Sequence, residues 1–269
     1  MSDREQVSGM SSTPIPPAHV SIAAGADTRS ALEKKLGYHM PLTYAERDAL
    51  RWLERRERSV TAGSIVVEEH EQTDDLFVVA SGWLHGSTRL ADGARQILRF
   101  YFVGDITTTL SLPWGYSAAT LTAVSNCTLF QISRSALARI FREYPRLAAL
   151  LYTVSTAEQV AMCDRLTSVG RTDALTRIGT LLLQIRAQLE IVDGPSGAVF
   201  ALPLTLQDLG DATGLTKTHV GRTLRALEKE RLIERDGKII RLLDIDALAR
   251  QCNFKDRQTK VATSWLQEL

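Results

Sequence analysis

The sequence LTLQDLGDATGLTKTHVGRTLRALEKE, residues 204–230, has the parts of two short helices joined by a tight turn. Thr205 is placed to cap the first helix and Thr216 the second, because a threonine hydroxyl can accept a hydrogen bond from a free backbone N–H of the first turn. Gly214 suits the left-handed backbone of the turn, and Gly210 is small where the two helices must cross. The stretch therefore predicts a helix-turn-helix.

The second predicted helix has one apolar face and one cationic face. Val220, Leu224 and Leu227 recur at i, i+4 and i+7, so they fall within a narrow arc. The opposite face carries hydroxyl and basic side chains, namely Thr218, Arg222, Arg225 and Lys229. From residue 216 to 231 there are five Lys or Arg against two Glu, a local charge of +3 (5 − 2). Taken alone, such a face most often indicates only a solvated helix. Together with a capped first helix and a tight turn, this cationic face favours a helix that contacts DNA bases.

Elements on both sides of this stretch fit a winged arrangement. After it, LIERDGKIIRLLD contains two short β runs around Asp236-Gly237, which is a strong hairpin signal and predicts a wing. Before it, residues 172–190 predict a helix with apolar positions from Ile178 to Ile185. That helix should end before the loop at residues 193–197. The last 20 residues or so predict one or two short helices of unassigned role.

From residue 59 to 133 the sequence changes to short runs rich in β-branched and aromatic residues. The runs are SIVVEE, LFVVASG, LHGSTRL, QILRFYF, ATLTAV and TLFQIS. Turn signals such as Asp92-Gly93 separate them at roughly 8–12-residue spacing, which predicts a small antiparallel sandwich or barrel. Residues 31–56 before the runs and 135–169 after them predict helices, the second interrupted near Pro145. The overall fold class is therefore α+β.

The helix predicted from Pro145 carries apolar residues at spacings of three and four. They are Leu147, Leu150, Leu151, Val154, Ala157, Val160 and Ala161. The pattern leaves two interpretations open: the helix packs on its own sheet, or it pairs with the same helix of a second copy in a two-stranded coiled coil.

Composition excludes several classes of protein. The 269 residues have a net charge of +1, which disfavours a protein that coats nucleic acid non-specifically. Cys127, Cys163 and Cys252 lack metal-ligand spacing, so we expect no metal, no disulfide framework and a reducing cytoplasm. No apolar run is long enough for a membrane span, and we expect no secretory signal. No phosphate loop, nucleophile elbow or metal-binding His pair points to an enzyme.

The β-rich segment, long helix and winged helix-turn-helix together resemble the Crp/Fnr family of bacterial transcription regulators over roughly residues 40–250. The resemblance implies a regulator that binds an inverted repeat of double-stranded DNA as a homodimer, with RNA polymerase as a further partner. It divides the chain into a flexible arm, a cyclic-nucleotide-binding-like β-roll, a dimerisation helix, a DNA-binding domain and an extension. Their expected limits are residues 1–28, 29–144, 145–170, 171–252 and 253–269. The seven apolar residues of the long helix would then form the dimer interface.

The resemblance also assigns DNA contacts. Base contacts in the family come from the start of the recognition helix, which corresponds here to Lys217, Thr218 and Arg222. Arg222 suits bidentate hydrogen bonding to guanine. Many family members have Glu where this chain has Thr218, so the family's commonest half-site is not expected here. The expected phosphate contacts are Thr205, Gln207, His219, Arg225 and Lys229.

The predicted sensor domain departs from the family pattern where cyclic-AMP-binding members hold the phosphate. In GDITTTLSLPWGYSAATL, Thr108 and Thr109 replace a Gly-Glu pair, and Tyr116 stands where an Arg should precede Ser117. These four residues would form a degenerate ligand pocket. A buried phosphate without a cation is costly, so we predict no response to cyclic AMP. The domain would bind another small ligand, or none.

Haem is the other ligand considered for the sensor domain. Single ligands could come from His39, His70, His85, Cys127 or Cys163, although an isolated His or Cys is more often structural. No cysteine precedes Cys127, which argues against an N-terminal iron–sulfur cluster. We therefore expect no cofactor. The alternative function is a sensor module for a small molecule or haem that acts on a protein partner.

Overall fold

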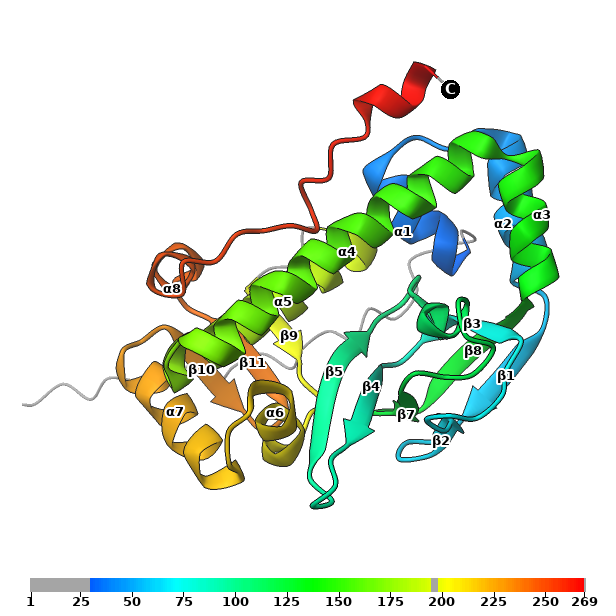
Figure 1. The fold of residues 1–269 in the computed structure, drawn as a ribbon. Coiled ribbons are helices and arrows are strands. Elements are labelled where there is room, and N and C mark those ends of the chain that lie inside the picture. The colour runs from blue at the N-terminus through cyan, green and yellow to red at the C-terminus, as the bar shows by residue number, and fades with distance from the viewer. Residues whose placement is uncertain (1–29, 195–197, 269) are drawn as a thin grey trace, which may run out of the picture.

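The computed structural model describes residues 30–194 and 198–268, so the predicted arm at residues 1–28 lies outside it. A single long helix, α4 (Pro145–Arg171), crosses the molecule diagonally in Figure 1. A β-rich part with three helices lies beside its N-terminal half, and the helix-turn-helix lies at its C-terminal end. None of the helices in the described residues has the length and apolarity that a bilayer crossing requires.

Two helices, α1 (Ala31–His39) and α2 (Tyr44–Leu53), occupy the segment that the sequence predicted as one helical stretch. The break at Met40 has a local cause. Pro41 follows it, and a residue before proline is driven to extended backbone, which Met40 shows with φ −157° and ψ 138°. Thr43 caps the start of α2, because Thr43 and Glu46 form a reciprocal capping box.

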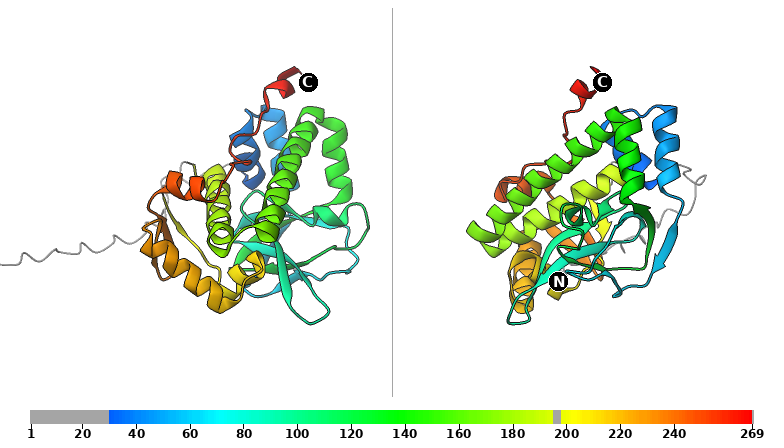
Figure 2. Two further views of the ribbon diagram at one scale, coloured as in Figure 1. Left: turned by 60° about the vertical axis from the view of Figure 1, so that its left-hand side comes forward. Right: turned by 45° about the vertical axis from the view of Figure 1, so that its right-hand side comes forward.

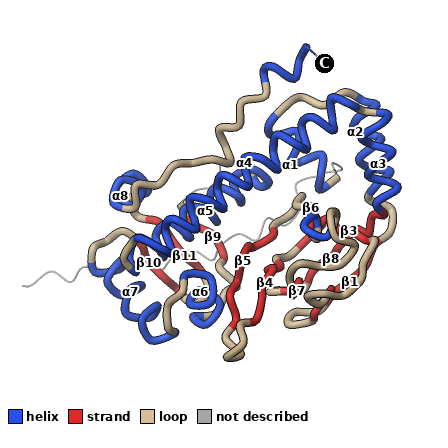
Figure 3. The backbone as a smooth tube through the Cα atoms, viewed as in Figure 1, coloured by secondary structure: helices blue, strands red, loops and turns tan. Residues whose placement is uncertain are grey.

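Two four-stranded antiparallel sheets pack face to face and confirm the predicted sandwich (Figure 3). The six predicted runs are β2 (Ile65–Val67), β3 (Asp75–Ser81), β4 (Leu84–Arg89), β5 (Arg95–Tyr101), β7 (Thr120–Ala123) and β8 (Cys127–Ser133). Sequence analysis missed β1 (Glu57–Val60) and β6 (Ile106–Thr107). The strand order is β1-β8-β3-β6 in one sheet and β2-β7-β4-β5 in the other. Neither segment has a strong β signal, because β1 (ERSV) is mostly polar and β6 has only two residues. Both become strands by pairing with a neighbour, β1 with β8 and β6 with β3.

A buried group of four charges fastens α4 to the sheets. Lys35 of α1 pairs with Asp105 in the loop before β6, and its Nζ lies 2.7 Å from Glu158 Oε1 of α4. Arg99 of β5 donates to the same Glu158 oxygen at 2.8 Å. Burial raises the pKa of Glu158, but the two cations outweigh that effect and bring the pKa to about 2. The carboxylate is therefore charged at neutral pH and holds α4 in place.

Packing of α4 corrects the predicted dimer stripe. Pro145 begins the helix after α3 (Arg134–Glu143), as predicted. However, Leu147, Leu150 and Val154 are buried in a cluster that also contains side chains of α1, α2 and α3. Ala161 is buried too. These four side chains cannot face a second copy, because their contacts are already made within the chain. Of the other three, Leu151 and Ala157 are half-buried, and Val160 is exposed.

The opposite face of α4 is open and follows its own stripe, with residues spaced alternately by four and three. We call it the α4 stripe, and its members are Tyr152, Thr156, Gln159, Cys163, Leu166 and Gly170. Two large members are markedly exposed: Tyr152 at 73% and Leu166 at 75%. Such spacing is the pattern of a helix that packs along one partner helix.

The end of the chain returns along α4 (Figure 2). After α8 (Ile245–Gln251), residues 252–263 run beside α4 to the short helix η2 (Ser264–Glu268). We call residues 252–268 the C-terminal strap. Leu266 is fully buried in the cluster that holds Leu147 and Leu150, and the Thr263 hydroxyl donates to the His39 carbonyl at 2.7 Å. Of the one or two short helices predicted in about the last 20 residues, one is present as η2, and it anchors the strap.

Candidate nucleic-acid interface

The first helix of the motif, α6 (Leu206–Thr213), begins with the predicted cap. The Asp208 N–H donates to Thr205 Oγ1 at 3.1 Å, and the Thr205 N–H donates back to Asp208 Oδ2 at 2.9 Å. This reciprocal pair satisfies backbone groups that would otherwise lack partners at the helix start. Leu209 and Thr213, four residues apart, are buried on the inward face of α6.

The turn between the helices depends on its two glycines. Gly214 ends α6 with a left-handed φ of 67°, which most side chains disfavour. At Gly210 a Cβ atom would lie 2.4 Å from the carbonyl oxygen of Leu215, so any larger residue would push the turn away. Both predictions are confirmed.

The second helix, α7 (Lys217–Lys229), is fixed by its apolar face. The His219 N–H donates to the Thr216 hydroxyl at 3.3 Å, which confirms the predicted cap. Val220, Leu224 and Leu227 are buried with the apolar residues of α5 (Ala174–Asp193) and α6. A helix held this firmly along one face presents its other face at a defined angle.

The exposed side of α7 brings together all three predicted base-reading residues. Lys217, Thr218 and Arg222 are exposed, and no residue of the sensor domain forms a hydrogen bond or ion pair with them within the described chain. Of the predicted phosphate contacts, His219, Arg225 and Lys229 are exposed on the same helix. Thr205 and Gln207 differ, because each side chain already donates within α6: Thr205 to Asp208 at 2.7 Å and Gln207 to Asp211 at 2.6 Å.

The predicted wing forms from β10 (Ile233–Asp236) and β11 (Ile239–Leu242), with Gly237 at φ 58° in the turn. A third strand, β9 (Val199–Ala201), pairs with β11 and was not predicted. Arg235 of the wing donates to both carboxylate oxygens of Glu228 on α7, at 2.8 and 2.9 Å. This pair neutralises the acidic side chain nearest to the cationic face.

A contact between the sensor domain and the helix-turn-helix was not predicted from the sequence. Arg95 of β5 donates to Asp208 at 2.6 Å and to Asp211 at 2.6 Å, so one guanidinium bridges two carboxylates of α6. Beside it, Gln96 donates to the Asp211 carbonyl at 2.8 Å. From α4, Arg165 donates to the Ala212 carbonyl at 2.8 Å. The DNA-reading motif is thus docked on the β4–β5 hairpin of its own chain.

His85 of β4 lies against the same contact and makes folding sensitive to acid. Burial, with Arg95 nearby, lowers the pKa of His85 to about 4, although Asp208 and Asp211 act in the opposite direction. In the unfolded chain a histidine titrates near 6.5. Between about pH 6.5 and 4 His85 is therefore protonated in the unfolded state and neutral in the folded state. The free energy of unfolding falls as the pH falls through this range.

We expect the thermal unfolding midpoint to drop between pH 7 and pH 4, and His85→Gln to make the drop smaller. Differential scanning fluorimetry across that range measures it. His219→Gln, at an exposed histidine, is the matched control and should leave the profile unchanged. An equal drop in His85→Gln and the unaltered chain would contradict the assignment.

The degenerate pocket residues are not gathered around an anion site. Thr108 is left-handed, with φ 57°, and its hydroxyl donates to backbone carbonyls of Asp75 and Thr107. Ser117 donates to the Ala119 carbonyl, and Tyr116 turns partly outward beside Trp114. Thr109 begins the short helix η1 (Thr109–Ser111). From residue 104 to 118 the sequence contains no Lys or Arg, so this segment supplies no cation for a cyclic phosphate.

Two family profiles match the chain in the order that the fold shows. The cyclic nucleotide-binding domain matches residues 57–144, and the Crp-like helix-turn-helix domain matches residues 176–251. The nitrogen fixation regulation protein FixK of Bradyrhizobium diazoefficiens is 32% identical over 193 residues, which cover 70% of this chain and 80% of FixK. The chain belongs to the Crp/Fnr family.

Other relatives agree with this assignment. The transcriptional activatory protein AadR of Rhodopseudomonas palustris is 30% identical over 185 residues, covering 67% of this chain and 76% of AadR. The structure of FixK2 from Bradyrhizobium japonicum superposes with a TM-score of 0.64 at 26% identity, covering 72% of this chain and 95% of FixK2. This Crp/Fnr protein is accordingly a DNA-binding transcription regulator and not an enzyme. The alternative of a sensor that acts only on a protein partner is not favoured.

Proposed function

We propose that this Crp/Fnr regulator binds an inverted-repeat operator as a homodimer and reads bases with Lys217, Thr218 and Arg222. The observation that carries the proposal is the exposure of these three side chains at the start of a helix whose other face is buried. An α-helix fits the major groove, where base pairs present distinct hydrogen-bonding patterns. Arg222 then contacts a guanine, and Thr218 contacts a neighbouring base or a thymine methyl group.

The phosphate contacts that we propose divide into two groups. Arg225, Lys229 and His219 lie on the exposed side of α7 and can meet the DNA backbone directly. Thr205 and Gln207 lie at the start of α6, where the partial positive charge of a helix N-terminus attracts phosphate. Their present partners within α6 must be exchanged for phosphate oxygens when DNA binds.

The homodimer that we propose uses the α4 stripe in place of the four predicted residues that are buried within the chain, Leu147, Leu150, Val154 and Ala161. Pairing along residues 152–170 places two recognition helices about a two-fold axis. Half-sites should then lie about 34 Å, or roughly 10 base pairs, apart. The predicted division of the chain is retained, with the sensor domain at 29–144, the dimerisation helix at 145–170 and the DNA-binding domain at 171–252.

Cyclic AMP is not the signal in this proposal. The segment that would hold the phosphate has no cation, and the Thr108 hydroxyl is already bonded to the backbone. Isothermal titration of the purified chain with cyclic AMP should show no heat of binding at micromolar concentrations, and operator affinity should not change in its presence. Saturable micromolar binding would overturn this prediction.

Selection of bound sequences from random duplex DNA, followed by mobility shift on the selected site, tests the proposal directly. We expect an inverted repeat with a guanine in each half-site. Enrichment of an asymmetric site would reject the homodimer geometry, and no enrichment would reject sequence-specific reading. We also propose that the regulator acts in the cytoplasm and contacts RNA polymerase, because its relative AadR is named as an activatory protein.

A further inference from the structure

We infer that the homodimer interface is a two-walled channel along α4, and that the C-terminal strap is one of its walls. The occupant of the channel is α4 of a second copy of this chain. The inference rests on the proposed homodimer. It adds to the interface two surfaces that lie outside the α4 stripe.

The first wall is the segment that has lost the phosphate-binding residues. Between this segment, α1 and α4 lies an apolar groove of about 740 Å³. Its rim displays Leu110, Leu112 and Trp114, with exposed fractions of 51%, 37% and 63%. Phe141 of α3 adds a fourth apolar side chain that is 49% exposed. Apolar side chains gathered in this way mark an interaction surface, because leaving them in water is unfavourable.

The second wall is the C-terminal strap, on the other flank of α4. A groove of about 430 Å³ lies between the strap and α4, with Val261 and Trp265 on the strap side and Ala157 and Val160 on the helix side. Trp265 is 52% exposed, although the next residue, Leu266, is fully buried. The strap thus holds a large aromatic side chain at the edge of the α4 stripe.

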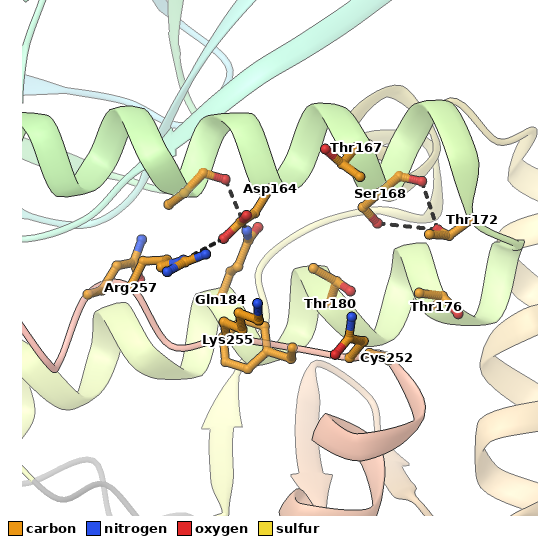
Figure 4. A pocket seen from close by; sticks show the side chains of 14 residues that line it. Asp164, Thr167, Ser168, Thr172, Thr176, Thr180, Gln184, Cys252, Lys255 and Arg257 are labelled. Carbon is orange, nitrogen blue, oxygen red and sulfur yellow. Dashed lines mark hydrogen bonds and ion pairs between the residues drawn. The ribbon is translucent and has the colours of Figure 1, made fainter.

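The strap is rigid enough to act as a wall because it is attached to α4 at separated points. Figure 4 shows the attachment near its start, where the Arg257 guanidinium donates to Asp164 Oδ2 at 2.9 Å across a small polar cavity. Within the strap, the Asp256 carboxylate accepts from the N–H groups of Gln258 and Thr259, at 2.9 Å each. Leu266 fixes the far end in the core.

Three features point to a second copy as the occupant. Both grooves border the α4 stripe, and Tyr152 lines each of them, so the apolar surface is continuous from wall to wall. All six stripe residues are uncharged. In a parallel helix pair related by a two-fold axis along the helices, each stripe residue lies opposite its own copy, so a charge there would meet a like charge. The nearest acidic groups, Glu158 and Asp164, are already paired within the chain.

Sedimentation equilibrium of the full chain tests the two walls separately. We expect Trp265→Ser and Trp114→Ser each to weaken dimerisation by about tenfold or more, because buried tryptophans dominate interface affinity. Both side chains are more than half exposed in the single chain, so neither change removes core packing. Tyr44→Ser is the matched control, since Tyr44 is 85% exposed and lines neither groove.

A second readout is protection from a maleimide. Val261→Cys in a Cys163→Ser background should react slowly in the dimer, and at least tenfold faster when Leu166→Glu is added. The remaining cysteines, Cys127 and Cys252, are buried. If the unaltered chain is monomeric, the proposed homodimer itself fails. If it is dimeric and both tryptophan variants dimerise as tightly as Tyr44→Ser, only the two-walled channel is refuted, and fast labelling in the dimer refutes it too.

Discussion

Leu166→Glu is expected to turn the regulator into a monomer that binds its operator about 100-fold more weakly, or worse. Leu166 is a 75% exposed member of the α4 stripe, so the change leaves the core intact. In the dimer, two glutamates would face each other across the two-fold axis, where little water can screen them. Losing the dimer removes the second half-site, and a linked pair of sites contributes roughly 10²–10⁴ in affinity.

Sedimentation and mobility shift on the selected operator measure the two effects of Leu166→Glu. Ile65→Glu is the matched control: Ile65 is a 49% exposed aliphatic residue on β2 and lines no part of the channel. Cys163 offers an independent check, because it is an exposed member of the α4 stripe and a short bis-maleimide should link two copies there. A Leu166→Glu protein that stays dimeric and links at Cys163 would place the interface elsewhere.

Arg222→Ala is expected to cost about 1–3 kcal/mol per half-site and to remove the preference for one base pair. Two half-sites double that cost to about 2–6 kcal/mol, so operator affinity should fall by about 30-fold or more. Arg222 has no bonded partner within the described chain that could compensate or rearrange, and its loss leaves Val220 and Leu224 packed as before. Repeating the selection with the variant should return a site that is degenerate at the guanine.

Lys229→Ala is the comparison that distinguishes a base contact, which sets sequence preference, from a phosphate contact, which only positions the protein on DNA. Lys229 lies on the same side of α7, in its last turn, where a phosphate contact is expected. Its removal should lower the affinity for all DNA sequences by the same factor. It should also reduce the slope of log affinity against log salt concentration by about one. If Arg222→Ala behaves in this way and leaves the selected site unchanged, the helix does not dock as proposed.

The helix-turn-helix could be predicted from sequence because its determinants are local. Thr205 and Thr216 cap the next turn of chain, and Gly214 adopts its own left-handed backbone, so each signal and its effect lie within four residues. The six predicted strands were found for a similar reason, since each run carries its own β-branched and aromatic residues and is bounded by its own turn signals. Lys217, Thr218 and Arg222 lie together because all three fall within the first two turns of one helix.

The errors in prediction concern contacts between distant segments. Leu147 and Val154 have the spacing of a dimer seam, but α1, α2 and the returning strap cover them, and no short window of sequence shows that. Arg95 and Asp208 are 113 residues apart, so their ion pair is equally invisible in a local pattern. The α4 stripe was overlooked because Thr156, Gln159 and Gly170 are not apolar, and only the structure shows which side of the helix is left open.

The bridge from Arg95 to Asp208 and Asp211 joins the sensor domain directly to α6 of the helix-turn-helix, in addition to the covalent connection through Thr172 between α4 and α5. Binding energies at two linked sites are reciprocal: whatever free energy the sensor domain imposes on DNA binding, DNA imposes on the sensor domain. A ligand of the sensor domain that changed this contact would therefore change operator affinity, and operator DNA would change the affinity for that ligand by the same factor.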